Sequence, residues 1–213
     1  MNEKNKRCQT IGEEIANSVS HGVGALLALA GAVLLIVRSI STGSGKAVAS
    51  LAAYGVSLVL LYTASAVYHA VRDQRIKVWL RVMDHCSIFI LILGTYIPMS
   101  LLVIGGKAGW LLFLINTALA VIGITLTTID LARFDRFNLV LYALMGWLVV
   151  IAMKSVVAVM TPVETALLAG GGVAYTVGII FYRSKGSYMH FVWHLFVLAG
   201  SVLQYLSILM SCL

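Results

Sequence analysis

Two histidines four residues apart open the last apolar segment of the chain, in the stretch YMHFVWH at residues 188–194. Residues four apart on a helix lie on the same face. His190 and His194 can therefore offer two nitrogens to one metal ion, as paired histidines do in helical zinc motifs. A third imidazole, His69, stands at the end of the second apolar segment. Together the three side chains predict a metal site built from histidines.

Two further residues have the chemistry to complete a hydrolytic site. Three histidines leave the fourth position of a tetrahedral zinc ion open, which is typical of catalytic zinc, and zinc lowers the pKa of bound water from about 15.7 to about 7. Asp84 opens the third apolar segment and can act as general base. Ser65 lies one helical turn from His69 and can orient a ligand or hydrogen-bond a substrate carbonyl. We predict Asp84 and Ser65 as catalytic residues, with His69, His190 and His194 as metal ligands.

The roles of the remaining two histidines stay open. His85 lies about 100° around a helix from Asp84, so only one of the two can point squarely at the centre of a bundle. We expect Asp84 to do so, because a carboxylate facing lipid is costly. His21 follows EEIANSVS at residues 13–20, which is typical of an amphipathic lead-in with capping residues. Asn17 or His21 could also reach the site.

Each of these features has a plainer explanation when it is taken alone. A histidine pair at a helix start is more often a polar pair at the membrane interface, and His69 could form an ion pair with Asp84. Their recurrence at one depth on three segments favours metal binding. Histidine nitrogens suit zinc, copper, nickel or iron, so the residues alone leave the metal open.

The elements that must position these residues are membrane-spanning helices. The 213-residue chain is 61% apolar and 11% charged, and its apolar runs of about twenty residues are typical of spanning helices. The connections between them are short and carry helix breakers. We predict an all-α membrane protein, a seven-transmembrane helix bundle forming one domain over residues 1–213, with a short polar lead-in at 1–14. The predicted spans are residues 15–37, 48–68, 82–104, 110–129, 139–159, 165–182 and 190–210.

The basic residues predict how the bundle is oriented. Lys and Arg in short loops stay on the cytoplasmic side. With a cytoplasmic N-terminus and an outside C-terminus, eleven of the fifteen basic residues fall on the cytoplasmic side, and the outer four are Arg38, Lys46, Lys107 and Lys154. All five histidines and Asp84 then fall at cytoplasmic helix ends.

Composition also limits the partners and the location. The formal charge is +7, but the basic residues are scattered through short loops, so we expect contact with membrane lipids and no nucleic acid. Three cysteines, Cys8, Cys86 and Cys212, show no paired spacing, which argues against a disulfide framework or a thiolate zinc site. The expected location is the cell membrane, with several passes.

The joint pattern resembles a known family. SAVYH at residues 65–69, MDHCSIFILILGTYIP from residue 83, the histidine pair of the last segment and the lead-in EEIANSVSHGVGA are similar to the hemolysin III branch of the progestin and adipoQ receptor family. The resemblance covers nearly the whole chain. It implies seven helices with the N-terminus inside. It also implies a zinc ion held by His69, His190 and His194, with Asp84 contacting zinc through water and Ser65 beside it.

Three functions follow from these residues and from the resemblance. The first is an intramembrane zinc-dependent hydrolase of a lipid amide or ester, since members of the family are linked to ceramidase-like amide hydrolysis. The second is a non-enzymatic membrane protein in which structural zinc braces the helices and the bundle regulates the lipid state of the membrane. The third, suggested by the family name, is a pore-forming cytolysin. A pore needs polar lining through the whole membrane, and the outer halves of most predicted spans are apolar.

Overall fold

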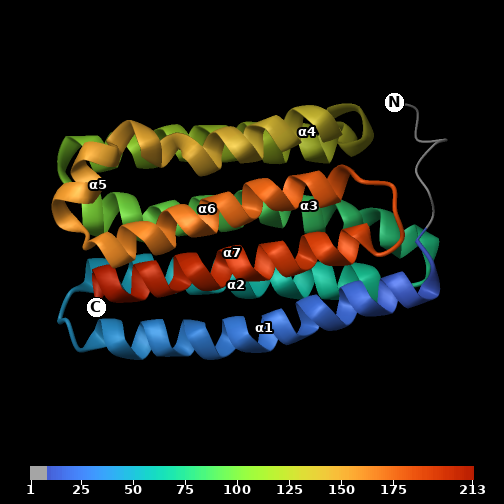
Figure 1. The fold of residues 1–213 in the computed structure, drawn as a ribbon, viewed down its shortest axis with the longest axis horizontal. Coiled ribbons are helices and arrows are strands. Elements are labelled where there is room, and N and C mark those ends of the chain that lie inside the picture. The colour runs from blue at the N-terminus through green and yellow to red at the C-terminus, as the bar shows by residue number, and fades with distance from the viewer. Residues whose placement is uncertain (1–8) are drawn as a thin grey trace.

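The computed structural model describes residues 9–213, and these form long helices that run nearly parallel to one axis (Figure 1). The arrangement is all-helical, as predicted. Cys8 and the first basic residues lie outside the described part, and Cys86 and Cys212 are free thiols. The helices are α1 (Ile11–Ile40), α2 (Gly45–Ala70), α3 (Gln74–Pro98) continued by a π-helical turn (Met99–Ile104), α4 (Gly106–Trp147), a 3-10 turn (Leu148–Ala152), α5 (Met153–Val159), α6 (Pro162–Arg183) and α7 (Met189–Cys212).

The first helix begins inside the predicted polar lead-in. Thr10 is its N-cap: the Thr10 hydroxyl accepts a hydrogen bond from the Glu13 backbone N–H at 3.2 Å, and the Glu13 carboxylate accepts one from the Thr10 backbone N–H at 2.8 Å. This reciprocal capping box satisfies two of the backbone donors that a helix start leaves free. The polar lead-in is therefore helical from Ile11 onward.

The count of spanning helices differs from the prediction. Six stretches in the described part of the chain are long and apolar enough to cross a membrane, where seven were predicted. The predicted spans 110–129 and 139–159 lie in one helical stretch, Gly106–Val159. Between residues 124 and 145 the sequence has neither proline nor glycine, and only Asp130 departs from helical dihedral angles within α4, so the two predicted spans are joined without a loop between them.

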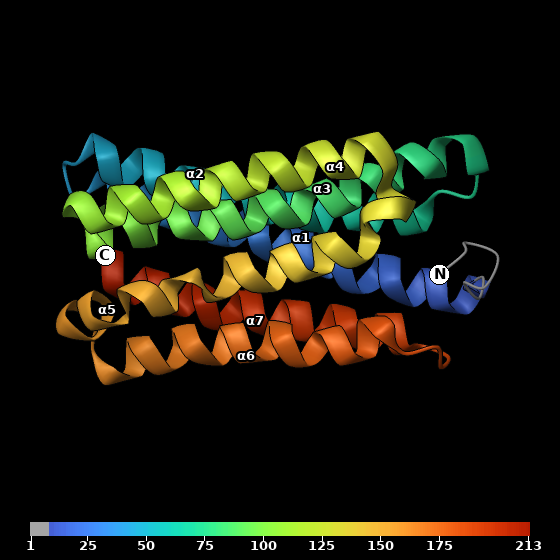
Figure 2. The same cartoon turned by 90° about the horizontal axis from the view of Figure 1, so that it is seen from above.

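The backbone of α4 nevertheless breaks at one residue. Asp130 has φ −160° and ψ 91°, which is extended and not helical, and its carboxylate accepts a hydrogen bond from the Arg133 backbone N–H at 2.9 Å. Figures 1 and 2 show that α4 reverses direction along its length. The two arms of α4 are joined by the Asn138 amide, which donates to the Thr127 hydroxyl at 2.9 Å. Asp130 caps the second arm.

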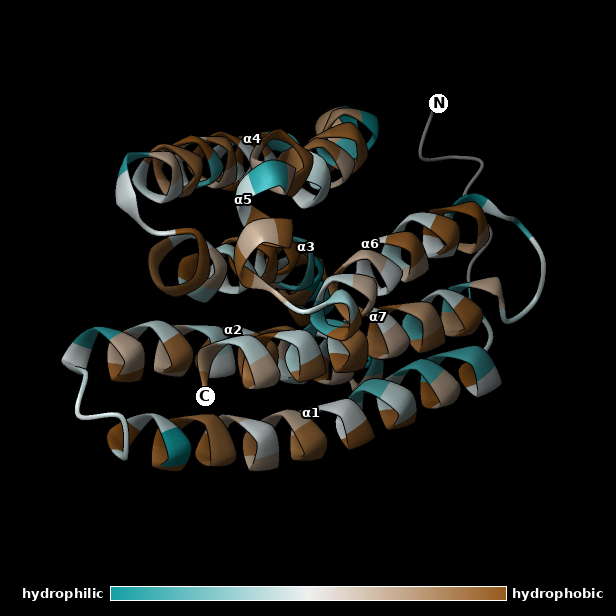
Figure 3. Cartoon of the chain, turned by 60° about the vertical axis from the view of Figure 1, so that its left-hand side comes forward, coloured by the Kyte–Doolittle hydropathy of each residue, from teal (hydrophilic) through white to brown (hydrophobic). Residues whose placement is uncertain are grey.

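The outer surface of the bundle is apolar. Large hydrophobic side chains of α1 such as Leu26 and Leu27 are exposed, and Figure 3 shows hydrophobic residues along most of the length of the helices. Leu35, Leu51, Tyr54 and other apolar residues fill the interior. A water-soluble protein does not expose so much continuous apolar surface, so this surface is suited to contact lipid tails.

Several helix ends meet at one end of the bundle. The start of α1, the end of α2, the start of α3, the reversal within α4 and the start of α7 all lie there, while α7 finishes at the opposite end (Figure 1). Every residue proposed above for chemistry therefore lies toward the same end. Which end faces the cytoplasm stays a prediction.

Candidate metal centre

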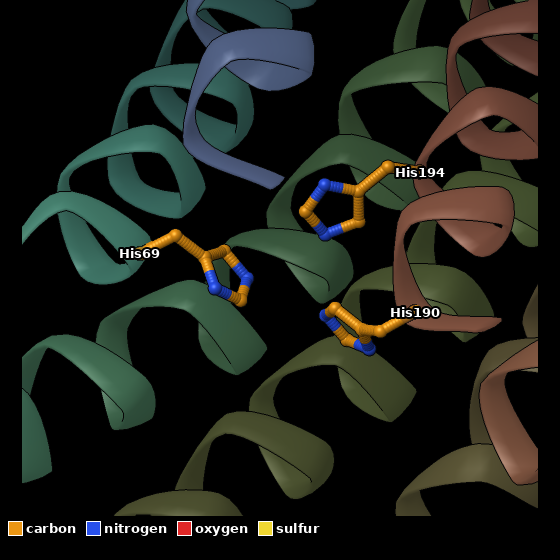
Figure 4. Close-up of side chains that lie close together, drawn as sticks. All are labelled: His69, His190 and His194. Carbon is orange, nitrogen blue, oxygen red and sulfur yellow. The ribbon is translucent and has the colours of Figure 1, made fainter. Parts of the chain in front are cut away.

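The three histidines predicted to bind a metal come together between α2 and α7. One ligand atom from each of His69, His190 and His194 lies within 4.8 Å of the other two. The ring centroids are 5.2 Å apart for His69 and His190, 5.1 Å for His69 and His194, and 4.7 Å for His190 and His194. Figure 4 shows the three rings pointing toward one another from two helices. Residues more than 120 positions apart in the sequence thus share one site.

The start of α7 is held in place by α1. Tyr188, the N-cap of α7, has φ 60°, a left-handed backbone conformation that residues other than glycine rarely adopt. Its backbone N–H donates to the Glu13 carboxylate at 2.7 Å. The same carboxylate closes the capping box of α1, so one buried side chain fixes the start of both helices. This contact sets where His190 begins the first turn of α7.

The chemistry of His69 fits a metal ligand. Its side chain is 1% exposed, and Nδ1 lies 2.7 Å from a Glu14 carboxylate oxygen. A carboxylate can only accept, so Nδ1 carries the proton and Nε2 keeps its lone pair. Nε2 is buried and has no hydrogen-bond partner. A buried nitrogen lone pair without a partner is costly, and a metal ion would satisfy it.

His194 is also buried, and its ring contacts α1. Its Nδ1 lies 3.3 Å from the Ser20 hydroxyl, and that hydroxyl donates its own hydrogen to the Asn17 carbonyl at 2.9 Å. Ser20 must therefore accept from His194 Nδ1–H, which leaves Nε2 of His194 as the free lone pair. The ring of His21 stacks on one face of the His194 ring, with centroids 3.6 Å apart and an interplanar angle of 9°.

Asp84 and Ser65 lie beside the histidines. Both residues line one cavity with His190 and His194. The predicted catalytic roles of Asp84 and Ser65 stay predictions. His85 Nδ1 lies 3.9 Å from the Asp84 carboxylate and donates to the Arg81 carbonyl at 2.8 Å. The alternative ion pair of His69 with Asp84 is not formed, because His69 pairs with Glu14.

A cavity of about 120 Å³ opens next to these residues. Ser65, Asp84, His85, His190 and His194 line it, together with apolar side chains of α2, α3, α4, α6 and α7. Both Asp84 and His85 reach the cavity, although their positions around α3 had led us to expect only Asp84. The cavity combines a few convergent polar groups with apolar walls, which is typical of small-molecule sites.

The sequence reasoning missed the contribution of α1. Glu14, Asn17 and His21 were interpreted chiefly as part of a capped lead-in, yet Asn17 and His21 are buried and Glu14 contacts a predicted ligand. Their spacing of three and four residues places them on one helix face. That spacing was the signal, because a first-turn glutamate on the same face as a buried histidine points into the bundle.

Comparisons with known proteins match most of the length of this chain. Residues 9–205 match the family model described as Haemolysin-III related. The chain is similar to "Hemolysin-3" of Bacillus cereus, with 37% identity over 98% of this chain and 96% of the relative, and to "Hemolysin-3 homolog" of Bacillus subtilis (strain 168), with 38% identity over 95% and 96%. It is also similar to "Monocyte to macrophage differentiation factor" of Homo sapiens, with 27% identity over 92% and 83%.

Proposed function

This chain belongs to the haemolysin-III-related family and is a multi-pass protein of the bacterial cell membrane, and we propose that it hydrolyses a lipid amide or ester at a histidine-bound zinc ion. The observation that carries the proposal is the meeting of three imidazole ligand atoms within 4.8 Å beside a cavity. The free, buried Nε2 of His69 supports it.

In this proposal His69, His190 and His194 hold the metal ion. A bound zinc ion would supply a water of pKa about 7 and an open position for the substrate carbonyl. Zinc bonds to histidine are about 2.0–2.1 Å long, so donor nitrogens around one ion lie closer together than 4.8 Å. Small rotations of the three side chains would bring the nitrogens to the distances that one ion requires.

Asp84 is the proposed general base and acid. Its carboxylate takes a proton from the attacking water as the water oxygen bonds to the substrate carbonyl carbon. The same proton then goes to the leaving nitrogen or oxygen as its bond to that carbon breaks, giving a fatty acid and an amine or alcohol. Ser65 lines the same cavity as Asp84, where its hydroxyl would hydrogen-bond the carboxylate and orient it.

The cavity suits a substrate with one polar end and one apolar end. Its polar lining includes Ser65, Asp84 and His190, and its walls include Leu61, Ile88 and other aliphatic residues. Trp147 and Thr176 also line it, are exposed on the outer surface, and form a hydrogen bond of 3.0 Å. A lipid chain in the membrane would meet the cavity wall at this pair.

The proposed topology is seven crossings with a cytoplasmic N-terminus. A straight stretch of 54 residues would be about 80 Å long, whereas the hydrocarbon layer is about 30 Å thick. The break at Asp130 and the hydrogen bond between the arms support two crossings within Gly106–Val159. The excess of Lys and Arg at the site end supports placing that end in the cytoplasm.

The test is hydrolysis by purified protein in lipid nanodiscs, given a panel of lipid amides and esters, with released fatty acid measured by mass spectrometry. Asp84→Asn should abolish release while zinc content stays equal to that of the wild type. Asp130→Asn is the matched control, because it removes a carboxylate that caps α4 and does not line the cavity. Turnover that persists in Asp84→Asn would contradict the role of Asp84 as general base. If no lipid releases fatty acid, the proposed hydrolase activity is wrong.

A second candidate function is structural. The three imidazoles come from α2 and α7 alone, so an ion held there would tie two helices together without any chemistry. Structural zinc usually has four protein ligands, and the described residues supply only three to this cluster. Stability that depends on zinc in a protein without hydrolytic activity would favour bracing.

The names of the Bacillus relatives make lysis a third candidate. A conducting path needs polar lining across the membrane. Recording of purified protein in planar bilayers decides this point: zinc-independent single-channel currents would favour a pore.

A further inference from the structure

The histidines of the candidate metal site are contacted from behind by α1, which supplies no ligand to it. Glu14 contacts His69, and Ser20 and His21 contact His194. Glu14, Asn17 and His21 recur every three to four residues, so one face of α1 is turned toward the site. Neither the family match nor the ligand cluster accounts for these contacts.

Glu14 is itself held on its other side. Its Oε2 accepts from His69 Nδ1–H at 2.7 Å, and its Oε1 accepts from the Lys77 ammonium at 2.7 Å. The Lys77 ammonium also lies 5.2 Å from the centre of the Tyr68 ring, a cation–π distance. Glu14 is 23% exposed and Lys77 15%, so water screens the pair only in part. With both oxygens engaged, the carboxylate cannot turn away from His69.

The hydrogen bonds from α1 choose the tautomer of two ligands. Glu14 can only accept, and the Ser20 hydroxyl has already donated its hydrogen to Asn17. Both His69 and His194 must therefore carry their proton on Nδ1. Each ring is left with its lone pair on Nε2, the nitrogen on the side away from α1.

We propose that Glu14 is a positioning residue for the metal ion, and that with Lys77 and Ser20 it presents Nε2 of His69 and of His194 for binding. The inference rests on the metal site of the proposed function and names the residues that tune it. A carboxylate hydrogen-bonded to a ligand histidine fixes the ring and makes it a stronger ligand, and loss of such a partner typically lowers metal affinity 10- to 100-fold.

The experiment measures zinc affinity of the purified full-length chain by competition with a chromophoric chelator. Glu14→Ala should weaken binding by about 10- to 100-fold. Glu14→Gln should weaken it less, because the amide oxygen still accepts from Nδ1–H. Lys77→Met should have an effect no larger than that of Glu14→Gln, since the carboxylate remains.

Two matched controls separate positioning from general damage. Ser18 is a serine of α1 whose hydroxyl donates to the Ala66 carbonyl at 2.9 Å and contacts no histidine of the cluster, so Ser18→Ala should leave affinity unchanged while Ser20→Ala lowers it. Glu164 closes the capping box of α6 at the opposite end of the bundle, so Glu164→Gln should also leave affinity unchanged. If Glu14→Ala does not fold, Glu14→Gln carries the measurement.

A spectroscopic readout tests the coordination itself. With cobalt(II) as the probe, Glu14→Ala should shift the visible d–d bands toward those of His69→Ala, as expected when one nitrogen ligand is lost. A wild type that binds zinc together with a Glu14→Ala affinity within twofold of it would overturn this inference and leave the metal site standing. A wild type that does not bind zinc would overturn the metal site, and this inference with it.

Discussion

The imidazole of His21 lies flat against that of His194, with 3.6 Å between ring centroids and 9° between ring planes. His21 is buried, and neither of its ring nitrogens has a hydrogen-bond partner. The edge of Tyr62 packs against His21 at 5.1 Å, and Gly24 leaves room for Tyr62, because a Cβ there would come within 2.7 Å of its ring. His21 thus forms part of the wall behind a predicted ligand.

Two substitutions of His21 should have opposite effects. His21→Phe keeps a flat ring against His194 and removes two unpaired polar atoms, so stability should be equal or higher and zinc affinity should stay within about threefold. His21→Ala leaves a cavity and should lower stability by roughly 3 kcal/mol. Thermal unfolding in detergent and chelator competition measure both. Loss of zinc binding in His21→Phe would show that the His21 nitrogens themselves matter.

Removal of metal should destabilise the bundle. Zinc at 100 times its dissociation constant adds about 2.7 kcal/mol to the stability of a protein that binds it only when folded. Chelation should therefore lower the unfolding temperature of the wild type. The double variant His190→Ala, His194→Ala should show no zinc-dependent shift, and an equal shift in that variant would place the metal elsewhere.

Ser65 should affect turnover without affecting the metal. Ser65→Ala removes the hydroxyl proposed to orient the Asp84 carboxylate in the cavity that both residues line, and a hydrogen bond to a charged group contributes about 1.5–3 kcal/mol. We expect kcat to fall roughly 10- to 100-fold with zinc content unchanged. Ser57→Ala is the control, since the Ser57 hydroxyl donates to the Tyr54 carbonyl away from the histidines. A variant that loses zinc would assign Ser65 to the ligand shell.

Labelling of single cysteines tests the seven crossings. In a chain without its native cysteines, a cysteine at Arg133 should react with a membrane-impermeant maleimide from the same side as one at Lys185. Cysteines at Lys107 and Lys154 should react from the opposite side. In right-side-out vesicles of known orientation, reaction at Arg133 from the outside would reverse the proposed orientation. Reaction of Lys107 and Lys154 from opposite sides would contradict two crossings within Gly106–Val159.

The histidine cluster could be predicted from sequence because spacing and depth are both visible there. His190 and His194 lie one turn apart, and His69 lies at the matching end of another apolar segment. Glu14 could not be assigned in the same way. It follows Glu13, which closes the capping box. The sequence does not distinguish two adjacent acids in a first turn, and only the packing of α1 shows that Glu14 contacts His69 of α2.

The helical boundaries show a similar limit. Apolar runs identified the membrane segments, but the reversal at Asp130 depends on the dihedral angles of one residue and on its contact with the Arg133 backbone. The hydrogen bonds of Asn138 with Thr127 and of Asn116 with the Met145 carbonyl, which pair the two arms, join residues that no local pattern links. Such contacts become visible only after the arms are folded together.

The hydrogen bond between Glu13 and Tyr188, the N-cap of α7, has a consequence for biogenesis. α1 is synthesised before α7, so this hydrogen bond can form only after every intervening helix has been made. A chain that stops before Tyr188 lacks two of the three imidazoles and the backbone N–H that donates from Tyr188 to Glu13. The proposed metal site can therefore form only after α7 has been synthesised and has packed beside α2.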